Sequence, residues 1–354
     1  MRFLVIGGSG FLGSHIIEAL RARRVDYKQP ISIAVYDIVK PLPEETIDAV
    51  TYYVGDIVNE AKLTEVMKEF QPNLVFHTAS PLHGLPPAVY YRVNVEGTRT
   101  VFSSCRAASV KNVIYTSSMG VIWTGAELDG VSEDQVSIPK HGYDAYHHTK
   151  AAAELISLDE NGVDGMRVVV LRPCGIFGER DKQMFWRMAE VLEKGQQNVQ
   201  IGSNTSLVDY AYVGNVAHAH VLAADKLLTE PDTVTGQVFF ITNGTPMTHW
   251  NFARMVFKAL GDDGTKKVVV IPRSIAMVMA VIAEIWAKIT GQQTTFTRFS
   301  IASVTNVQWF NIEKARKILN YEPQVSLEEG VQRTAQWWKK SGATQHKAQE
   351  KKNV

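Results

Sequence analysis

Cysteine and excess charge of either sign are both scarce in this sequence of 354 residues. The two cysteines, Cys105 and Cys174, are too few for a disulfide framework or a four-ligand zinc site, so we expect a reducing compartment and catalysis by other side chains. Lysine and arginine number 37 against 36 aspartates and glutamates. The resulting net charge of +1 creates no overall field that would attract a polyanion, which argues against a nucleic-acid partner.

One apolar helical stretch, residues 275–289 (IAMVMAVIAEIWAKI), is too short to cross a bilayer. It has 15 residues, whereas a spanning helix needs about 20. Two interpretations stay open. The helix lies in the membrane interface or re-enters it, with Trp286 and Lys288 at the headgroups, or it is buried in the core. No basic and apolar leader precedes the opening RFLVIGG, so we expect the first residues to form a strand of the fold.

Short runs rich in Val and Ile alternate with helical patterns in the first half of the chain. After RFLVIGG, they occupy residues 31–37, 50–56, 73–79, 112–118 and 166–173. Such runs are typical of parallel strands that are covered by helices on both faces. We therefore predict an α/β fold, a doubly wound parallel sheet of the Rossmann type.

The alternation becomes irregular after residue 173, where we expect a smaller, mixed α/β lobe that shapes the substrate site. The predicted nucleotide-binding core spans residues 1–173, and residues 206–241 return to it. The predicted substrate lobe comprises residues 174–205 and 242–338, including the apolar stretch at 275–289. Residues 339–354 contain five lysines and one glutamate, which indicates a basic C-terminal tail.

A glycine-rich turn, GGSGFLG, joins the first strand to a helix expected from about residue 12 to 23. The first glycine allows a tight turn, the second lets the backbone approach a pyrophosphate, and the third allows close packing of the helix, whose N-terminus favours an anion. The spacing alone is a weak signal, and the strand before it and the helix after it give it weight. We expect cofactor contacts from Gly7, Gly10, Phe11, Leu12 and Gly13.

An acidic residue, Asp37, ends the second strand 24 positions after Gly13. Its carboxylate is suited to a ribose hydroxyl pair and would repel a 2′-phosphate, so we predict NAD rather than NADP as the cofactor. Asp56 is expected to meet the adenine edge or to be a plain turn residue. The other expected cofactor contacts lie at the ends of later strands: Ile57, Thr78, Ala79 and Pro173.

Tyr146 and Lys150 are four residues apart in a segment with helical periodicity, residues 143–156, and therefore project from one helix face. An ammonium group beside a phenol stabilises the phenolate, so we expect Lys150 to lower the pKa of Tyr146 and let it exchange a proton with an alcohol. Upstream, Ser117 and Ser118 end the fifth strand at the sheet edge where ligands lie. Successive strand residues point to opposite faces, so one of the two serines faces the nicotinamide.

In this order the motifs resemble the extended short-chain dehydrogenases/reductases: GGSGFLG, NVEGT around Asn94, YTSSMGVI, YHHTK, LRPCGIFG and DYAYVGNVA. The resemblance spans most of residues 1–220. It implies that Ser118, or failing that Ser117, positions the substrate oxygen. It also implies that Tyr146 is the acid/base and that Lys150 holds the nicotinamide ribose. His147 and His148, inside the same motif, are expected to be packing or solvated residues.

The predicted cleft rim is apolar, which favours a large apolar ligand over a sugar nucleotide, although ordinary lobe core is the alternative. The rim residues expected from the sequence are Leu82, Leu85, Phe177, Met184, Phe185 and Trp186. The C-terminal KKNV, with Lys351 and Lys352, resembles a dilysine retrieval signal of the endoplasmic reticulum. Together with residues 275–289, it leads us to expect an enzyme on the cytosolic face of the endoplasmic-reticulum membrane.

Within the family, these features are most similar to the 3β-hydroxysteroid dehydrogenase branch. That resemblance implies NAD-dependent oxidation of the 3β-hydroxyl of a 4α-carboxysterol, with loss of the carboxylate as carbon dioxide, in sterol biosynthesis. It also implies contacts with other sterol-demethylation enzymes and a homodimer formed through helices at about 88–109 and 143–160. Three alternatives stay open: 3β-hydroxysteroid oxidation with isomerisation, a sugar-nucleotide epimerase or dehydratase, and a cofactor sensor without chemistry.

Overall fold

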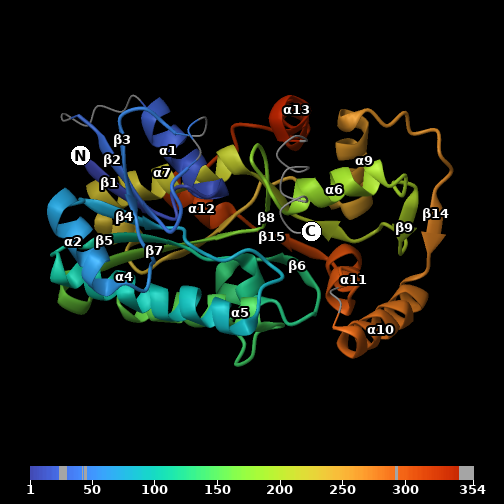
Figure 1. Ribbon diagram of the computed structural model, residues 1–354, viewed down its shortest axis with the longest axis horizontal. Helices are drawn as coiled ribbons and strands as arrows, with labels where there is room; N and C mark the ends of the chain where they lie inside the picture. The colour runs from blue at the N-terminus through green and yellow to red at the C-terminus, as the bar shows by residue number, and fades with distance from the viewer. Residues whose placement is uncertain (24–29, 42, 44–45, 292–293, 343–354) are drawn as a thin grey trace.

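A parallel sheet of seven strands forms the larger part of the molecule in the computed structural model, which describes residues 1–23, 30–41, 43, 46–291 and 294–342 (Figure 1). Each predicted run supplies one strand, and a late strand from the returning segment joins the edge. In spatial order the strands are β12 (Val238–Ile241), β7 (Arg167–Pro173), β5 (Asn112–Thr116), β4 (Leu74–His77), β1 (Arg2–Ile6), β2 (Ser32–Asp37) and β3 (Val50–Val54).

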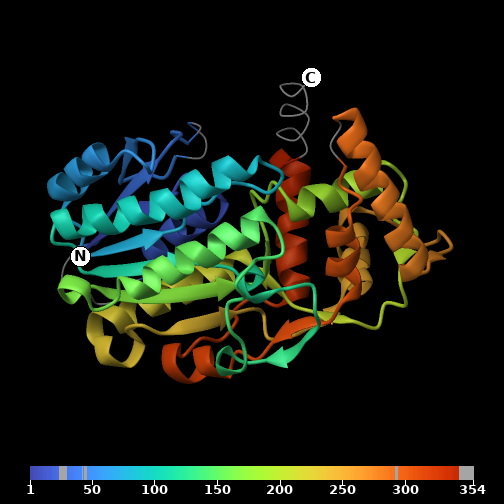
Figure 2. The same ribbon diagram turned by 90° about the horizontal axis from the view of Figure 1, so that it is seen from below.

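Helices cover both faces of this sheet, because alternate strand residues are apolar on both sides. In β1, Phe3 and Val5 belong to one buried cluster and Leu4 and Ile6 to the other. The first cluster includes α1 (Phe11–Ala22) and α7 (Val213–Thr229), and the second includes α2 (Glu60–Phe70), α4 (Gly97–Ala107) and α5 (Ala145–Asp159). The helices α4 and α5 run side by side (Figure 2). The predicted doubly wound α/β class is confirmed.

The helix that precedes α4 contains a wide turn. It begins as α3 (Pro87–Tyr90), passes through a π-helical turn at Tyr91–Glu96, and continues as α4. A π-turn inside an α-helix changes the direction of side chains and occurs frequently at functional sites. Here it places Asn94 in the interior, where the side chain is buried.

The rest of the chain builds a mixed lobe at the carboxyl end of the sheet (Figure 1). Its apolar centre combines α6 (Met184–Glu193), α9 (His249–Leu260) and α13 (Leu327–Trp337). A four-stranded sheet has the order β13 (Met247–Thr248), β10 (Leu207–Val208), β15 (Gln308–Phe310) and β6 (Leu128–Val131). Two strand pairs and two more helices complete it: β8 (Gly175–Phe177) with β11 (Tyr210–Tyr212), β9 (Val199–Ile201) with β14 (Val269–Ile271), α10 (Arg273–Thr290) and α11 (Arg298–Thr305). The short helices α8 (Pro231–Val234) and α12 (Glu313–Leu319) pack instead on the parallel-sheet core, beside α7.

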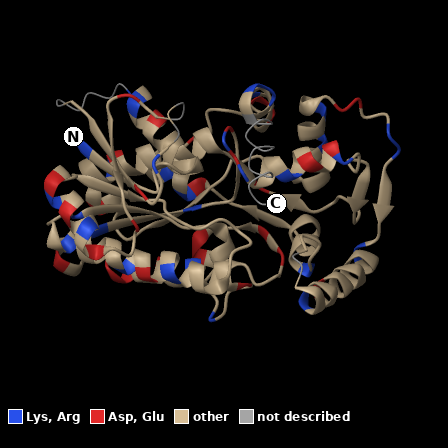
Figure 3. Cartoon of the chain, viewed as in Figure 1, with Lys and Arg blue, Asp and Glu red and all other residues tan. Residues whose placement is uncertain are grey.

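Helix α10, which contains the apolar stretch at 275–289, lies on the surface. Of its residues, Ala276 and Ala280 are buried, whereas Trp286 and Ile289 are 63% and 74% exposed. The alternative of a helix buried in the core is therefore wrong. Charges are spread over both lobes but are sparse along α10 (Figure 3). Within the described ranges, no helix is both long and apolar enough to span a bilayer. Lys351 and Lys352 lie outside the described residues.

Candidate active site

A single cavity runs along the carboxyl edge of the parallel sheet and continues into the second lobe. Every residue predicted to contact the cofactor or substrate oxygen borders it. From the sheet side these are Gly7, Gly10, Phe11, Leu12, Gly13, Asp37, Asp56, Ile57, Thr78, Ala79, Ser117, Ser118, Tyr146, Lys150 and Pro173. The topology therefore brings together residues that are far apart in the sequence.

The glycine-rich turn leaves no room for side chains. Gly7 has a φ of +84°, and a Cβ there would lie 2.7 Å from the backbone nitrogen of Ala79. A Cβ on Gly13 would collide with the carbonyl oxygen of Gly7, so the helix α1 packs directly on the turn. Gly10 precedes α1 and provides no side-chain cap. This backbone and helix end fit the pyrophosphate of a dinucleotide.

Two carboxylates follow β2 and β3 along the same edge. Asp37 accepts hydrogen bonds from the backbone nitrogens of Ser9 (3.0 Å) and Val39 (3.3 Å), which fix its orientation at the cavity, while burial raises its pKa. Asp56 accepts a hydrogen bond from Arg92 Nη2 at 2.6 Å. Asp37 is thus held as a ribose acceptor would be, whereas Asp56 has an ion-pair partner of its own.

The two serines after β5 have different environments. Ser117 donates a hydrogen bond to the buried carboxylate of Glu154, which also pairs with Arg172. Ser118 accepts a hydrogen bond from Gly120 N at 3.1 Å at the start of a 3₁₀ turn. Since the Ser117 hydroxyl is committed to Glu154, the geometry favours Ser118 as the residue that contacts the substrate oxygen.

Tyr146 and Lys150 share one face of α5. Asp144 caps the N-terminus of this helix, where its side chain accepts a hydrogen bond from His147 N. The expected lowering of the Tyr146 pKa is wrong in this structure. Burial is the main cause of a Tyr146 pKa raised to about 12, although a hydrogen bond with Ser80 opposes it. Burial also lowers the pKa of Lys150 to about 7.

Lys150 has other partners than the phenol in this structure. Its Nζ donates to Tyr115 Oη at 2.9 Å and to the carbonyl oxygen of Thr116 at 2.7 Å. These bonds hold the Lys150 side chain against the end of β5, at the border of the cavity. Lys150 is therefore suited to hold the cofactor, and its effect on the phenol depends on that binding.

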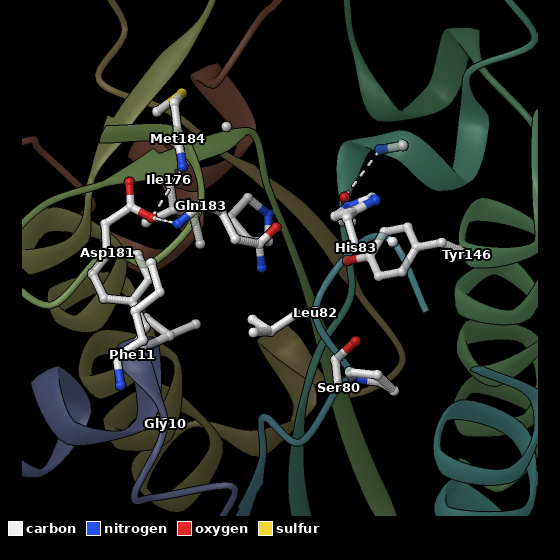
Figure 4. Close-up of a pocket in the computed structure, with 18 of the residues that line it drawn as sticks. Gly10, Phe11, Ser80, Leu82, His83, Tyr146, Ile176, Asp181, Gln183 and Met184 are labelled. Carbon is white, nitrogen blue, oxygen red and sulfur yellow. Dashed lines mark hydrogen bonds between the residues drawn. The ribbon is translucent and has the colours of Figure 1, made fainter. Parts of the chain in front are cut away.

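The positions of Asn94, Ser80 and His83 near Tyr146 were not predicted from the sequence. The π-turn places Asn94, whose amide donates to Thr149 Oγ1 at 3.1 Å and accepts from Ser80 Oγ at 3.2 Å. His83 lies against Tyr146, with their ring centroids 3.9 Å apart (Figure 4). The sequence does not reveal these positions, because a helix periodicity of 3.6 does not indicate a π-turn and loop residues carry no periodicity at all.

The predicted histidine roles agree with the structure. His147 is buried, with Nδ1 2.7 Å from Asp144 Oδ1, and its ring packs among Trp123, Tyr143 and Phe299. His148 is exposed.

The predicted apolar rim is partly wrong. Leu82 and Met184 border the cavity, but Phe177, Phe185 and Trp186 are buried in the core of the second lobe and Leu85 is exposed. In α6, Phe185 and Trp186 pack into the lobe core, and the buried carboxylate of Asp181 accepts three backbone N–H bonds at the start of that helix. The lobe side of the cavity is nevertheless largely apolar, lined by Trp123, Met188, Val191, Ile201, Phe257 and Phe299.

The fold and this arrangement of tyrosine, lysine and serine beside a glycine-rich turn define the extended short-chain dehydrogenase/reductase class. Residues 4–273 match the 3-beta hydroxysteroid dehydrogenase/isomerase family. The chain belongs to that family, as the sequence resemblance predicted.

Curated relatives match the chain over nearly its whole length. Sterol-4-alpha-carboxylate 3-dehydrogenase erg26, decarboxylating, of Schizosaccharomyces pombe is 39% identical over 95% of this chain and 97% of its own. The Saccharomyces cerevisiae enzyme of the same name is 40% identical, with 94% and 97% covered. The Homo sapiens sterol-4-alpha-carboxylate 3-dehydrogenase, decarboxylating, is 32% identical, with 95% and 87% covered.

Solved structures share the fold at lower identity. A UDP-glucose 4-epimerase from Thermotoga maritima superposes with a TM-score of 0.72 at 22% identity, covering 96% of this chain and 99% of the other. A dTDP-glucose 4,6-dehydratase from Bacillus anthracis, in complex with NAD, has a TM-score of 0.72 at 19% identity, with 97% and 98% covered. These similarities support the Rossmann-type architecture.

Proposed function

We propose that this protein oxidises the 3β-hydroxyl of a 4α-carboxysterol with NAD and releases the 4-carboxylate as carbon dioxide, as a step of sterol biosynthesis. One observation carries the proposal: Tyr146, Lys150 and Ser118 border a cavity that continues into the second lobe. There it is largely apolar and is lined by three helices and several loops. The names of the curated relatives, at 39–40% identity over almost the whole chain, support the same reaction.

The residues divide the chemistry among them. Tyr146 removes the proton of the 3β-hydroxyl, Ser118 holds the oxygen, and Lys150 with Asp37 holds the ribose groups of the dinucleotide. Bound NAD supplies the acceptor for the hydride that leaves carbon 3. The product is a 3-keto acid whose ketone takes up the electron pair released when the carbon–carboxylate bond breaks. Ser118 and protonated Tyr146 donate hydrogen bonds to that oxygen as its negative charge develops.

A sugar-nucleotide substrate fits the second lobe less well. A diphosphate and hydroxyls need many donors and cations, whereas aromatic and aliphatic side chains predominate on the lobe side of the cavity, with Arg187, Glu190 and Lys194 among its charged members. Oxidation with isomerisation differs from the proposed reaction by the absence of carbon dioxide. A cofactor sensor would not need the Tyr146 and Lys150 pair.

A substrate panel separates these functions. Purified protein and NAD are mixed with a 4α-carboxysterol, an uncarboxylated 3β-hydroxy-Δ5-steroid or UDP-glucose, and NADH and products are measured. We expect NADH with the carboxysterol at a kcat/KM well above that of the other two. Turnover of UDP-glucose without any response to sterols would contradict the proposal, and NAD binding without turnover would favour a sensor.

Coenzyme choice is expected to depend on Asp37. Asp37→Ala should lower kcat/KM for NAD by about 10- to 100-fold, because hydrogen bonds to a charged group are lost, and should narrow the preference for NAD over NADP. Steady-state kinetics with both coenzymes test this, and Asp263→Ala, on an exposed turn outside the cavity, is the matched control. An unchanged ratio of NAD to NADP activity would show that Asp37 does not contact the ribose.

We also propose that α10 and β14 dock on the cytosolic surface of the endoplasmic-reticulum membrane. An apolar surface of this kind favours a lipid interface, and the one acidic group of α10, Glu284, is already paired with Arg298 at 2.9 Å. Its exposed members are Val268, Val269, Val270, Ile275, Val278, Met279, Ile282, Ile285, Trp286 and Ile289. We further propose that the protein forms a homodimer through α4 and α5 and associates with other sterol-demethylation enzymes.

The docking surface is tested by vesicle co-sedimentation. The unsubstituted protein should sediment with phosphatidylcholine–phosphatidylserine vesicles. The double variant Ile282→Glu and Ile289→Glu should reduce the bound fraction at least tenfold, because each buried isoleucine contributes roughly 1.5–3 kcal/mol. Val163→Glu, an exposed apolar residue 43% accessible elsewhere on the surface, should have no effect. Failure of the unsubstituted protein to sediment would refute the docking surface.

A further inference from the structure

Helix α6 presents a single stripe of side chains to the cavity. Met184, Arg187, Met188 and Val191 follow the spacing of one helix face, and all four border the cavity. Three of them are apolar, as a sterol-binding wall requires. Arg187 is the exception in this stripe: its side chain is exposed and carries a permanent positive charge, and Glu190, one turn further along α6, also borders the cavity.

Within the described part of the chain, the exposed Arg187 guanidinium has neither a hydrogen bond nor an ion pair, although its charge acts on the buried carboxylate of Asp181 and opposes the rise of the Asp181 pKa. Other arginines that border the cavity have partners: Arg92 is paired with Asp56, and Arg180 with Glu18. Those pairs neutralise cations that lie near the expected dinucleotide. The donors of Arg187 are therefore available for an anionic ligand in the substrate half of the cavity.

His83 borders the same half of the cavity and lies beside the catalytic phenol. Its ring centroid is 3.9 Å from that of Tyr146, and Figure 4 shows it beside Tyr146, with Gln183 and Met184 across the cavity. The charge of Arg187 reaches His83: together with burial, the main cause, it lowers the His83 pKa to about 4. His83 is therefore neutral at pH 7 and presents one N–H donor.

We propose that Arg187 and His83 bind the 4-carboxylate of the sterol substrate. The inference rests on the proposed function, which places the 3-oxygen at Tyr146 and Ser118. Because carbon 4 is bonded to carbon 3, a carboxylate on carbon 4 lies beside the Tyr146 ring, where His83 is found. A guanidinium pairs with a carboxylate through two parallel hydrogen bonds, and His83 provides a third donor.

This pairing selects the substrate and does not speed the loss of carbon dioxide. An ion pair stabilises the carboxylate in the ground state, whereas the electrons of the breaking bond go to the 3-oxygen at Tyr146 and Ser118. Arg187 should therefore act mainly on KM. Once carbon dioxide has left, Arg187 has lost its anion, so the neutral ketone is held less tightly than the substrate.

The experiment compares two alcohols that differ only in the carboxyl group, a 4α-carboxysterol and the same 3β-hydroxysterol without it, by NADH formation in the full chain. Arg187→Met should lower kcat/KM for the carboxysterol about 10- to 100-fold, mostly through KM, and change that for the uncarboxylated sterol less than about twofold. Arg187→Lys should recover part of the loss. His83→Phe keeps a ring against Tyr146 but removes the donor, and should cause a smaller, roughly three- to tenfold, loss with the same selectivity.

Lys258→Met is the matched control, because it removes one exposed positive charge of the same lobe outside the cavity. It should leave both substrates unaffected. Suppose that the unsubstituted protein oxidises the carboxysterol, but that Arg187→Met lowers kcat/KM equally for both sterols or for neither of them. The carboxylate site is then refuted while the proposed function stands. If the unsubstituted protein gives no NADH with the carboxysterol, the proposed function itself fails.

Discussion

Replacing Tyr146 with phenylalanine is expected to lower kcat for sterol oxidation by about 100- to 10,000-fold, the usual contribution of a positioned acid/base. The ring would still pack beside His83 and Tyr90, so the fold and the affinity for NAD should change little. What is lost is the one group that takes the proton of the 3β-hydroxyl. Stopped-flow or steady-state measurement of NADH, with NAD affinity from a separate titration, tests this separation.

The pH profile adds a second measure of the same residue. Oxidation needs the unprotonated phenol, and burial raises the Tyr146 pKa to about 12. The rate should therefore rise with pH between about 6 and 9, since an increasing fraction of Tyr146 is phenolate. Tyr143→Phe is the control and should retain activity. Tyr143 stacks on Trp123 but does not itself border the cavity. Full activity of Tyr146→Phe would remove the basis of the mechanism.

The second large effect is on stability. Glu154 is fully buried in α5, and its carboxylate accepts hydrogen bonds from Arg172 Nε at 3.0 Å and from Ser117. Glu154→Ala leaves the Arg172 charge buried and unpaired, so the free energy of unfolding should fall by about 3–5 kcal/mol. Urea unfolding followed by circular dichroism measures the change.

Two control variants accompany this stability measurement. Glu329→Ala breaks an exposed pair with Arg333 and should cost less than about 1 kcal/mol. The double variant Glu154→Leu and Arg172→Met removes both charges and should recover much of the loss. A loss below about 1 kcal/mol for Glu154→Ala would show that Arg172 reaches solvent or another partner when Glu154 is gone.

The sheet and the cofactor half of the cavity were predictable because they depend on short-range signals. Residues 113–115 and 168–171 (VIY and VVVL) are continuous apolar runs, which are typical of strands buried on both faces. The spacing of the glycines is visible in the sequence and has a steric cause, because a Cβ at Gly7 or Gly13 would meet the backbone. Four-residue spacing on a helix likewise places Tyr146 and Lys150 together.

The substrate half was less predictable because it depends on long-range packing. Phe185 and Trp186 are as apolar as Met184 and Met188, and which of them face the cavity depends on how α6 packs in the second lobe. The position of His83 against Tyr146 depends on a loop without periodicity. The Lys150 partners at the end of β5 depend on how α5 docks on the sheet.

The most direct test of the account is the ratio of the two products in a single reaction. Purified protein is incubated with NAD and a sterol labelled at the 4α-carboxyl carbon, and NADH and labelled carbon dioxide are counted at the same times. The account predicts one carbon dioxide for each NADH, with both absent in Tyr146→Phe. Sustained NADH formation with the carboxyl label retained in the sterol would contradict it.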